Sequence, residues 1–172
     1  MNKLNGLVVA CMLLAPGLAS AAVVNGNITV LAEVGTGCTV TNTGGATANF
    51  GTIDFGEIYD FSGVDIVQQI DASGGTAGIE VECTVGTNYS IEVDGGQNYT
   101  GTSRALAGAV DEIAYTLHWN HYTDPAIPVS APEPFVAVAG SFTHTVWGKI
   151  AANHASVTPG SYTDVVAVIV SW

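Results

Sequence analysis

Few side chains in this sequence have the type and spacing that catalysis or metal binding requires. His118 and His121 are three residues apart, so on a β-strand they would point to opposite faces, whereas a zinc ion needs converging ligands. The Asp-Gly-Gly-Gln-Asn stretch that begins at Asp94 lacks the downstream glutamate of a calcium loop. Asp111 and Glu112 are adjacent and would point apart on a strand, which argues against a glycosidase pair. We therefore expect ordinary surface histidines, no metal, no cofactor and no enzymatic activity.

Cysteine usage points to structure rather than to catalysis. The chain has three cysteines, and Cys11 lies in the amino-terminal leader described below, which leaves Cys38 and Cys83. No Cys-x-x-Cys spacing suggests redox work, and in an oxidising compartment the remaining pair is expected to form a disulfide. Closing that loop would contribute about 4 kcal/mol by the chain-entropy account.

Three aromatic side chains offer another kind of chemistry. Trp119, Tyr122 and Trp147 could stack on a sugar ring, but aromatic residues at alternating strand positions are more often part of a core. We expect a core role for them, with a carbohydrate-binding surface as the alternative.

Residues 1–21 have the layout of a secretory signal peptide. Lys3 supplies a positive start, an apolar run follows, and Ala19-Ser20-Ala21 matches a signal-peptidase site, so the mature chain is expected to begin at Ala22. The run is too short to span a membrane comfortably, and no membrane insertion is expected after its removal. One alternative stays open, because Val8-Val9-Ala10-Cys11 resembles the cleavage box of a lipoprotein.

The chain is strongly acidic. Its formal net charge is −12, and removal of Lys3 would leave Arg104 and Lys149 against fifteen acidic residues, a net charge of −13. Nucleic-acid binding needs the opposite sign, and adsorption to an anionic membrane is disfavoured for the same reason. The acidity is typical of a repulsive, well-solvated surface on an exported protein.

The elements that position these residues are predicted to be β-strands. Residues of high strand propensity are plentiful, apolar and polar positions alternate, and turn-forming sequences separate the runs. The runs with one apolar face are 24–34, 64–70, 79–85, 89–93, 113–119, 146–150 and 162–172. Such a series indicates one sandwich or barrel with a single core. The proline-rich stretch 124–134 predicts a long exposed connection, and Arg104 to Val110 a short helical turn.

The two ends of the mature chain are complementary. Val24 to Val34 is an alternating run that precedes the first core cysteine, and Tyr162 to Trp172 is a very hydrophobic run with no strand after it. Pairing the first run of one molecule with the last run of another would satisfy both, and its burial would supply about 10 kcal/mol before ordering costs. The first run could equally fold back and close its own sheet. The apolar face of this first run consists of Val24, Ile28, Val30, Ala32 and Val34.

A series of short motifs resembles the subunits of archaic (Csu-type) chaperone–usher pili, the group that shares the spore coat protein U domain. In order and spacing these motifs cover nearly the whole mature chain. They are Thr36-Gly37-Cys38-Thr39-Val40, Phe50-Gly51-Thr52-Ile53-Asp54-Phe55-Gly56, Ile79-Glu80-Val81-Glu82-Cys83, Ile91-Glu92-Val93-Asp94-Gly95-Gly96, Arg104-Ala105-Leu106, Ile113-Ala114-Tyr115, Gly148-Lys149-Ile150 and Gly160-Ser161-Tyr162-Thr163-Asp164.

The resemblance implies an incomplete immunoglobulin-like β-sandwich over residues 36–172, which lacks its last strand and is preceded by a donor-strand extension over residues 22–35. A periplasmic chaperone would fill the open groove until an outer-membrane usher adds the subunit to the fibre, where the extension of a neighbouring pilin subunit replaces the chaperone strand. The family's disulfide would fall on Cys38 and Cys83. The acceptor groove would be lined by residues near Cys38 and by Val166, Val168, Val170 and Trp172.

The resemblance also implies a location and a role. The subunit would be exported through the periplasm to an extracellular pilus that serves adhesion and biofilm formation. A self-contained secreted coat or matrix protein, or a carbohydrate-binding β-sandwich, is the alternative. The proline-rich segment from His121 to Phe135 matches no motif of the family, so the choice between a main rod subunit and a minor one stays open.

Overall fold

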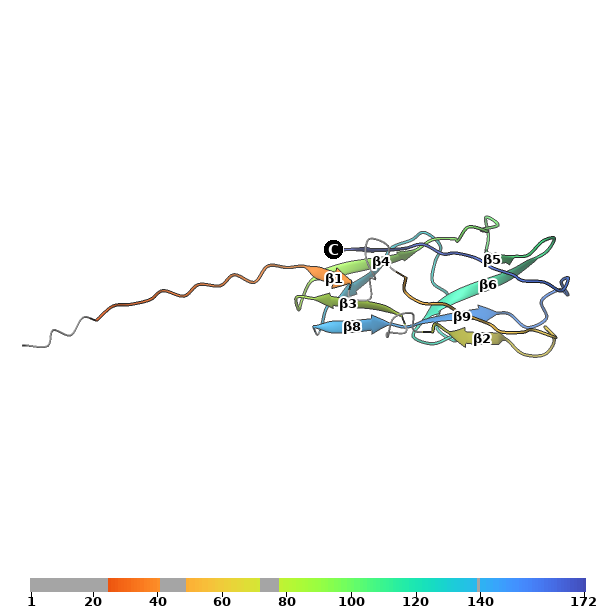
Figure 1. Cartoon of the computed structure of the whole chain (residues 1–172), viewed down its shortest axis with the longest axis horizontal. Coiled ribbons are helices and arrows are strands. Elements are labelled where there is room, and N and C mark those ends of the chain that lie inside the picture. Colours follow the sequence, from red (N-terminus) through yellow and green to blue (C-terminus); the bar gives the residue numbers. More distant parts are fainter. Residues whose placement is uncertain (1–24, 41–48, 72–77, 139) are drawn as a thin grey trace, which may run out of the picture. The chain divides into compact units, whose positions relative to one another are not determined.

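The computed structural model describes residues 25–40, 49–71, 78–138 and 140–172 (Figure 1). Within these ranges the regular structure consists of ten β-strands and no helix, so the predicted all-β class is confirmed. The strands are β1 (Cys38–Val40), β2 (Ile66–Gln69), β3 (Ile79–Cys83), β4 (Asn88–Val93), β5 (Arg104–Ala107), β6 (Glu112–Trp119), β7 (Glu133–Val136), β8 (Ser141–His144), β9 (Val146–Ile150) and β10 (Val168–Ser171).

The strands form three antiparallel sheets. Their orders are β1-β3-β8, β10-β4-β7 and β2-β9-β6-β5. A single residue separates β8 from β9, and the two strands lie end to end in Figure 1, so one length of chain passes from the first sheet to the third. Side chains from all three sheets belong to one core cluster, which makes residues 34–172 a single sandwich-like unit.

Alternating burial explains why these residues form strands. In β6, Ile113, Tyr115 and Leu117 are buried while the residues between them are more exposed, as the period-two pattern predicts. Ile91 and Ile150 are fully buried, and each such side chain stabilises the fold by about 1.5–3 kcal/mol. The runs 79–85, 89–93, 113–119 and 146–150 thus correspond to β3, β4, β6 and β9.

Several local expectations are wrong. The segment from Arg104 to Val110 is not a helical turn, because Arg104 to Ala107 pairs with β6 as strand β5. The proline-rich stretch is a connection over 124–132 as expected, but its last two residues begin β7, in which Pro134 sits opposite Ser90; β7 is the terminal strand of its sheet, where proline is tolerated. His118 is buried rather than on the surface, since its ring contacts the Asp124 carbonyl and the Thr116 hydroxyl.

The two terminal runs are less regular than their alternation predicts. The last run is a strand only over β10, although Thr163 forms an isolated bridge with Ala107. Residues 1–33 form a unit of their own, of which residues 25–33 are described; no strand is assigned to them, and Val24 lies outside the described residues. A strand requires a hydrogen-bonded neighbour, so alternation without one produces no ladder. In the described part of the chain, no helix is long and apolar enough to span a bilayer.

Candidate strand-acceptor site

The last apolar run, residues 162–171, is named here the acceptor run. Its even-numbered side chains are half-buried and its odd-numbered ones are exposed. Val166, Val168 and Val170 pack against the core, whereas Trp172 follows β10 and is 61% exposed. The acceptor run therefore presents one face to the interior along its length, and this face is apolar except at Asp164.

The backbone of the acceptor run has one paired edge and one open edge. The amide of Asp94 donates to the Ala167 carbonyl at 3.0 Å, and the register continues through Ile169 opposite Glu92. In an antiparallel ladder alternate residues direct their N–H and C=O groups to the same neighbour, so those of Val166, Val168 and Val170 face away from β4. Because β10 is the terminal strand of its sheet, no strand within the described ranges pairs with that side.

A second segment, residues 49–61, is named here the facing wall. Its half-buried apolar side chains that pack on the core are Phe50, Ile53, Phe55, Ile58 and Phe61. Its Ile53 and Phe55 side chains lie against Gly148 of β9, where a Cβ atom would be 2.8 Å from Ile53 Cγ2 and 2.7 Å from Phe55 Cζ. Tyr162 of the acceptor run lies in the same way against Gly108, with its Cε1 2.5 Å from the position of a Cβ atom. Both segments therefore pack on the β2-β9-β6-β5 sheet, over the strands that flank β6.

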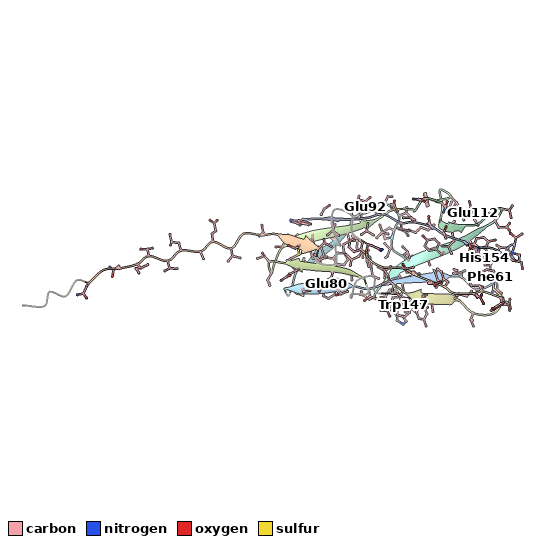
Figure 2. All side chains as sticks on the ribbon, viewed as in Figure 1. Phe61, Glu80, Glu92, Glu112, Trp147 and His154 are labelled. Atoms are coloured by element: carbon pink, nitrogen blue, oxygen red, sulfur yellow. A yellow bond between two sulfur atoms is a disulfide. The ribbon has the colours of Figure 1, made fainter. Side chains whose placement is uncertain are left out.

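The facing wall is held at both ends but is not itself part of a ladder. Thr52 bridges to Asp71 through hydrogen bonds of 2.7 and 3.4 Å. At the other end the Phe61 carbonyl accepts from the Asn153 amide at 2.6 Å, and the Phe61 ring lies 5.3 Å from that of His154, beside it in Figure 2. The candidate site is thus the unpaired backbone edge of β10 together with the half-buried side chains of Val166, Val168 and Val170, the geometry that accepts an additional strand.

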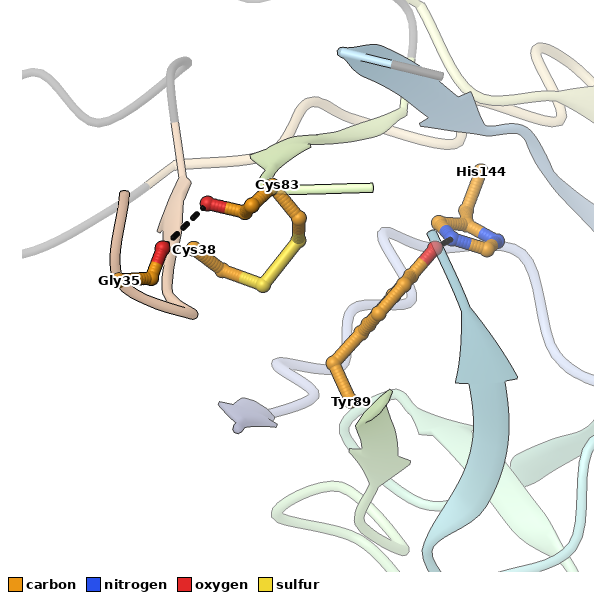
Figure 3. The surroundings of a disulfide bond; sticks show 6 residues. Gly35, Cys38, Cys83, Tyr89 and His144 are labelled. Atoms are coloured by element: carbon orange, nitrogen blue, oxygen red, sulfur yellow. Dashed lines mark hydrogen bonds between the residues drawn. A yellow bond between two sulfur atoms is a disulfide. The ribbon is translucent and has the colours of Figure 1, made fainter. Parts of the chain in front are cut away.

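The predicted disulfide is confirmed. Cys38 of β1 is bonded to Cys83 of β3, and the two residues are direct partners in the ladder (Figure 3). Thr84 adds hydrogen bonds to the Gly37 carbonyl at 3.0 Å and, through its hydroxyl, to the Gly35 carbonyl at 2.9 Å. The disulfide therefore fixes β1, the terminal strand of its sheet, to the core strand beside it.

A separate cavity of about 130 Å³ lies between β3 and β8 on one side and β4 and β7 on the other. At its wall the Tyr89 hydroxyl and His144 Nε2 are 2.7 Å apart, as Figure 3 shows. Burial lowers the pKa of His144 to about 4, so the ring is neutral at physiological pH. The remaining lining is largely apolar, from residues such as Val81 and Phe135. Among the residues described, no three His, Cys, Asp or Glu side chains are grouped so that they could hold a metal ion.

The three aromatic residues considered for sugar stacking do not form one surface. Trp119 is buried in the core, where its Nε1 donates to Glu133 at 2.6 Å. Trp147 packs instead with Tyr122 and His121, with ring centroids 5.6–5.8 Å from its own, and its Nε1 donates to the Asn120 carbonyl. These rings pack on one another at tilted angles rather than making a flat platform.

Sequence reasoning missed a polar cluster beside the acceptor run. Asp94, Asp164 and Arg104 converge there although they come from separate segments of the chain. The available signal was Arg104 itself, one of three basic residues in the sequence. An isolated arginine in a chain this poor in cations is 3% exposed, which indicates a structural task.

Comparison with known proteins assigns the family and the fold. The Spore Coat Protein U domain family matches residues 24–169. No curated protein matches the chain. The structure is similar to the P pilus rod subunit PapA, with a TM-score of 0.51 and 14% identity over 78% of this chain and 97% of that one.

It is also similar to a chain of the CsuC–CsuE chaperone–tip adhesion subunit pre-assembly complex from the archaic chaperone–usher Csu pili of Acinetobacter baumannii, with a TM-score of 0.47 and 14% identity. That match covers 81% of this chain but only 40% of the other. The likeness to PapA shows a shared fold, and the domain match extends over most of the sequence. The chain belongs to the Spore Coat Protein U domain family.

Proposed function

We propose that this protein is a structural, non-enzymatic subunit of a chaperone–usher pilus and that it polymerises by donor-strand exchange. The observation that carries the proposal is the open edge of β10, where Val166, Val168 and Val170 combine half-buried side chains with backbone groups directed away from β4. Family membership and the fold shared with a pilus rod subunit support the same role.

The amino-terminal extension has the properties that a donor strand needs. The side chains of Ile28, Val30 and Val34 are 91%, 84% and 82% exposed. Nearly all of their apolar surface would therefore be newly buried on insertion into a second molecule. At about 1.5–3 kcal/mol each they would contribute about 4.5–9 kcal/mol, before the cost of ordering the segment. The extension from Val24 to Val34 is also about as long as the acceptor run.

The donor face is expected to be the even-numbered one. Ile28 and Val30 share a face with Ala32 and Val34, while Leu31 points to the opposite side of an extended strand. Leu31 is 88% exposed and equally apolar, so it provides a matched internal control for the assignment.

In the proposed cycle a periplasmic chaperone lends a strand to the open edge, an outer-membrane usher brings subunits together, and the extension of the neighbouring subunit takes the chaperone strand's place. The product is an extracellular fibre with a role in adhesion and biofilm formation. Removal of residues 1–21 as a signal peptide belongs to the same proposal, since export must precede assembly.

A synthetic peptide of residues 22–35 tests the donor assignment. It should bind the full mature chain and raise its free energy of unfolding in urea. Peptides with Ile28→Asp or Val30→Asp should lose that effect, because a carboxylate would be buried against valines. A peptide with Leu31→Asp should retain most of it. Equal loss in all three peptides, or a stable monomer that is indifferent to the parent peptide, would favour a closed secreted domain instead.

A further inference from the structure

The inner edge of the acceptor run changes neighbours part of the way along. Thr163 exchanges two hydrogen bonds with Ala107 of β5, at 3.0 and 3.1 Å, whereas Val168 to Ser171 pairs with β4 in a different sheet. Between the end of β4 at Val93 and the start of β5 at Arg104 the chain leaves both sheets. Residues 164–167 therefore lie beside the loop that follows β4 rather than beside an assigned strand.

Two backbone hydrogen bonds and several side chains join this loop to the acceptor run. The amides of Asp94 and Gln97 donate to the carbonyls of Ala167 at 3.0 Å and Val165 at 3.1 Å. Asp94 Oδ1 accepts from the Ala167 amide at 2.8 Å, and Asn98 Nδ2 donates to the Thr163 carbonyl at 3.0 Å. Asp164 Oδ1 accepts from the Val165 amide at 2.9 Å and from both nitrogens of Asn98 at 3.2 Å. We name Asp94, Asn98 and Asp164 together the bracket. It supplies acceptors for the Val165 and Ala167 amides and a second donor to the Thr163 carbonyl, which also accepts from Ala107.

Asp164 is held in place from two directions. Its Oδ2 accepts from the Tyr115 hydroxyl at 2.7 Å; burial of Tyr115 raises the pKa of that phenol, and the hydrogen bond to Asp164 raises it further, so the phenol remains a donor. On the other side Gly96 has a φ of +81°, and a Cβ atom there would lie 2.1 Å from Asp164 Oδ2. Only glycine suits both the backbone and the space at this position.

Arg104 anchors the loop that carries the bracket. It is 3% exposed and donates to the carbonyls of Asp94 at 2.7 Å and Val93 at 2.9 Å. It also donates to the carbonyls of Ile127 at 3.0 Å and Pro128 at 3.3 Å. A buried guanidinium with several carbonyl acceptors fixes the turn after β4, and its charge lies close to the two bracket carboxylates.

We propose that the bracket positions the acceptor run for strand donation, by holding it extended over residues 164–167 so that its outer edge is straight before a donor arrives. Residues before and after 164–167 present backbone groups to that outer edge. If residues 164–167 departed from the extended conformation, they would interrupt the ladder that a donor strand must form. A preformed edge lowers the ordering cost that association otherwise carries. This inference rests on the proposed function.

The experiment compares Asp94→Ala and Asp164→Ala with the matched control Asp65→Ala in the full mature chain. Asp65 Oδ1 also accepts a main-chain hydrogen bond from a distant segment, from the Ala152 amide at 2.9 Å, but it lies beside β2. The probe is a fluorescently labelled peptide of residues 22–35, whose association rate is followed by stopped flow. Amide hydrogen exchange is recorded at Thr163 and Ile169, because the Thr163 amide donates to Ala107 of β5 and Ile169 is paired with Glu92 of β4, so neither amide bonds to a bracket side chain.

Both bracket variants should slow peptide association about tenfold, the effect of losing about 1.4 kcal/mol of prior ordering, and should speed exchange at Thr163 and Ile169. The control should change neither by more than about twofold.

An unchanged association rate, or an equal slowing by Asp65→Ala, would overturn the proposal and leave the bracket a purely stabilising feature. If Asp164→Ala does not fold, Asn98→Ala removes two bracket hydrogen bonds and serves in its place. If the parent chain fails to bind the peptide, the donor assignment is at fault, while exchange at Thr163 and Ile169 still decides whether the bracket orders the run.

Discussion

Gly148 of β9 provides the sharpest test of how the facing wall is seated. Replacing it with alanine places a Cβ atom 2.7 Å from Phe55 Cζ and 2.8 Å from Ile53 Cγ2, well inside van der Waals contact. The Phe55 ring tip can move aside, but Ile53 Cγ2 is attached close to the backbone, so the facing wall must shift with it. Such overpacking costs about 1–3 kcal/mol.

An opposing term reduces the net effect. Alanine restricts the conformations of the unfolded chain more than glycine does, and this stabilises the folded state by about 0.4–1 kcal/mol. We therefore expect Gly148→Ala to lower the free energy of unfolding by about 1–2 kcal/mol. The shifted wall should also weaken binding of the donor peptide.

Urea unfolding of the peptide-bound chain is the appropriate assay, with Gly160→Ala as the control. No heavy atom lies within 4 Å of a Cβ atom built at Gly160, so that variant should be neutral or slightly more stable. If Gly148→Ala unfolds at the same urea concentration as Gly160→Ala, then Ile53 and Phe55 do not pack on β9 as described.

Two further outcomes follow from buried groups. Replacing Cys38 and Cys83 with serine should lower the free energy of unfolding by about 4 kcal/mol, measured in urea against the oxidised parent, and an unchanged midpoint would mean that the disulfide does not constrain the unfolded chain. His144 has a pKa lowered by burial from 6.5 to about 4, so the unfolded chain binds a proton first as the pH falls. The free energy of unfolding should therefore be highest above pH 6.5 and fall by about 3 kcal/mol as the pH is lowered to 4. The variant His144→Gln should flatten that part of the pH profile. A parent profile that is already flat between pH 6.5 and 4 would contradict the burial argument.

Strands with strict alternation could be predicted from the sequence, because each buries one face independently of its neighbours. Ile79 and Val81 in β3, and Ile113 and Leu117 in β6, are buried as their spacing predicts. The cysteine pair was equally accessible, because only two cysteines remain outside the leader. These features depend on local pattern and composition, which a single sequence contains.

Features that depend on distant partners were not accessible. Local propensity predicted a helical turn from Arg104 to Val110, but pairing of Arg104 to Ala107 with β6 overrides that preference. The hydrogen bond between Asp94 and Ala167 joins residues 73 positions apart, so neither residue's role can be read from its surroundings in the chain. His118 was expected on the surface for a different reason: its carbonyl partner Asp124 is only six positions away, but it lies in the connection after β6, whose path over the ring the strand pattern does not predict.

The central claim is that the outer edge of β10 is completed by a strand from another molecule. Residue-resolved amide hydrogen exchange, compared between unassembled subunits and fibres, tests it directly. The amides of Val166, Val168 and Val170 should exchange rapidly in the subunit and slowly in the fibre, while that of Ile169, already paired with β4, should be protected in both. Equal protection of the three valine amides before and after assembly would contradict the account.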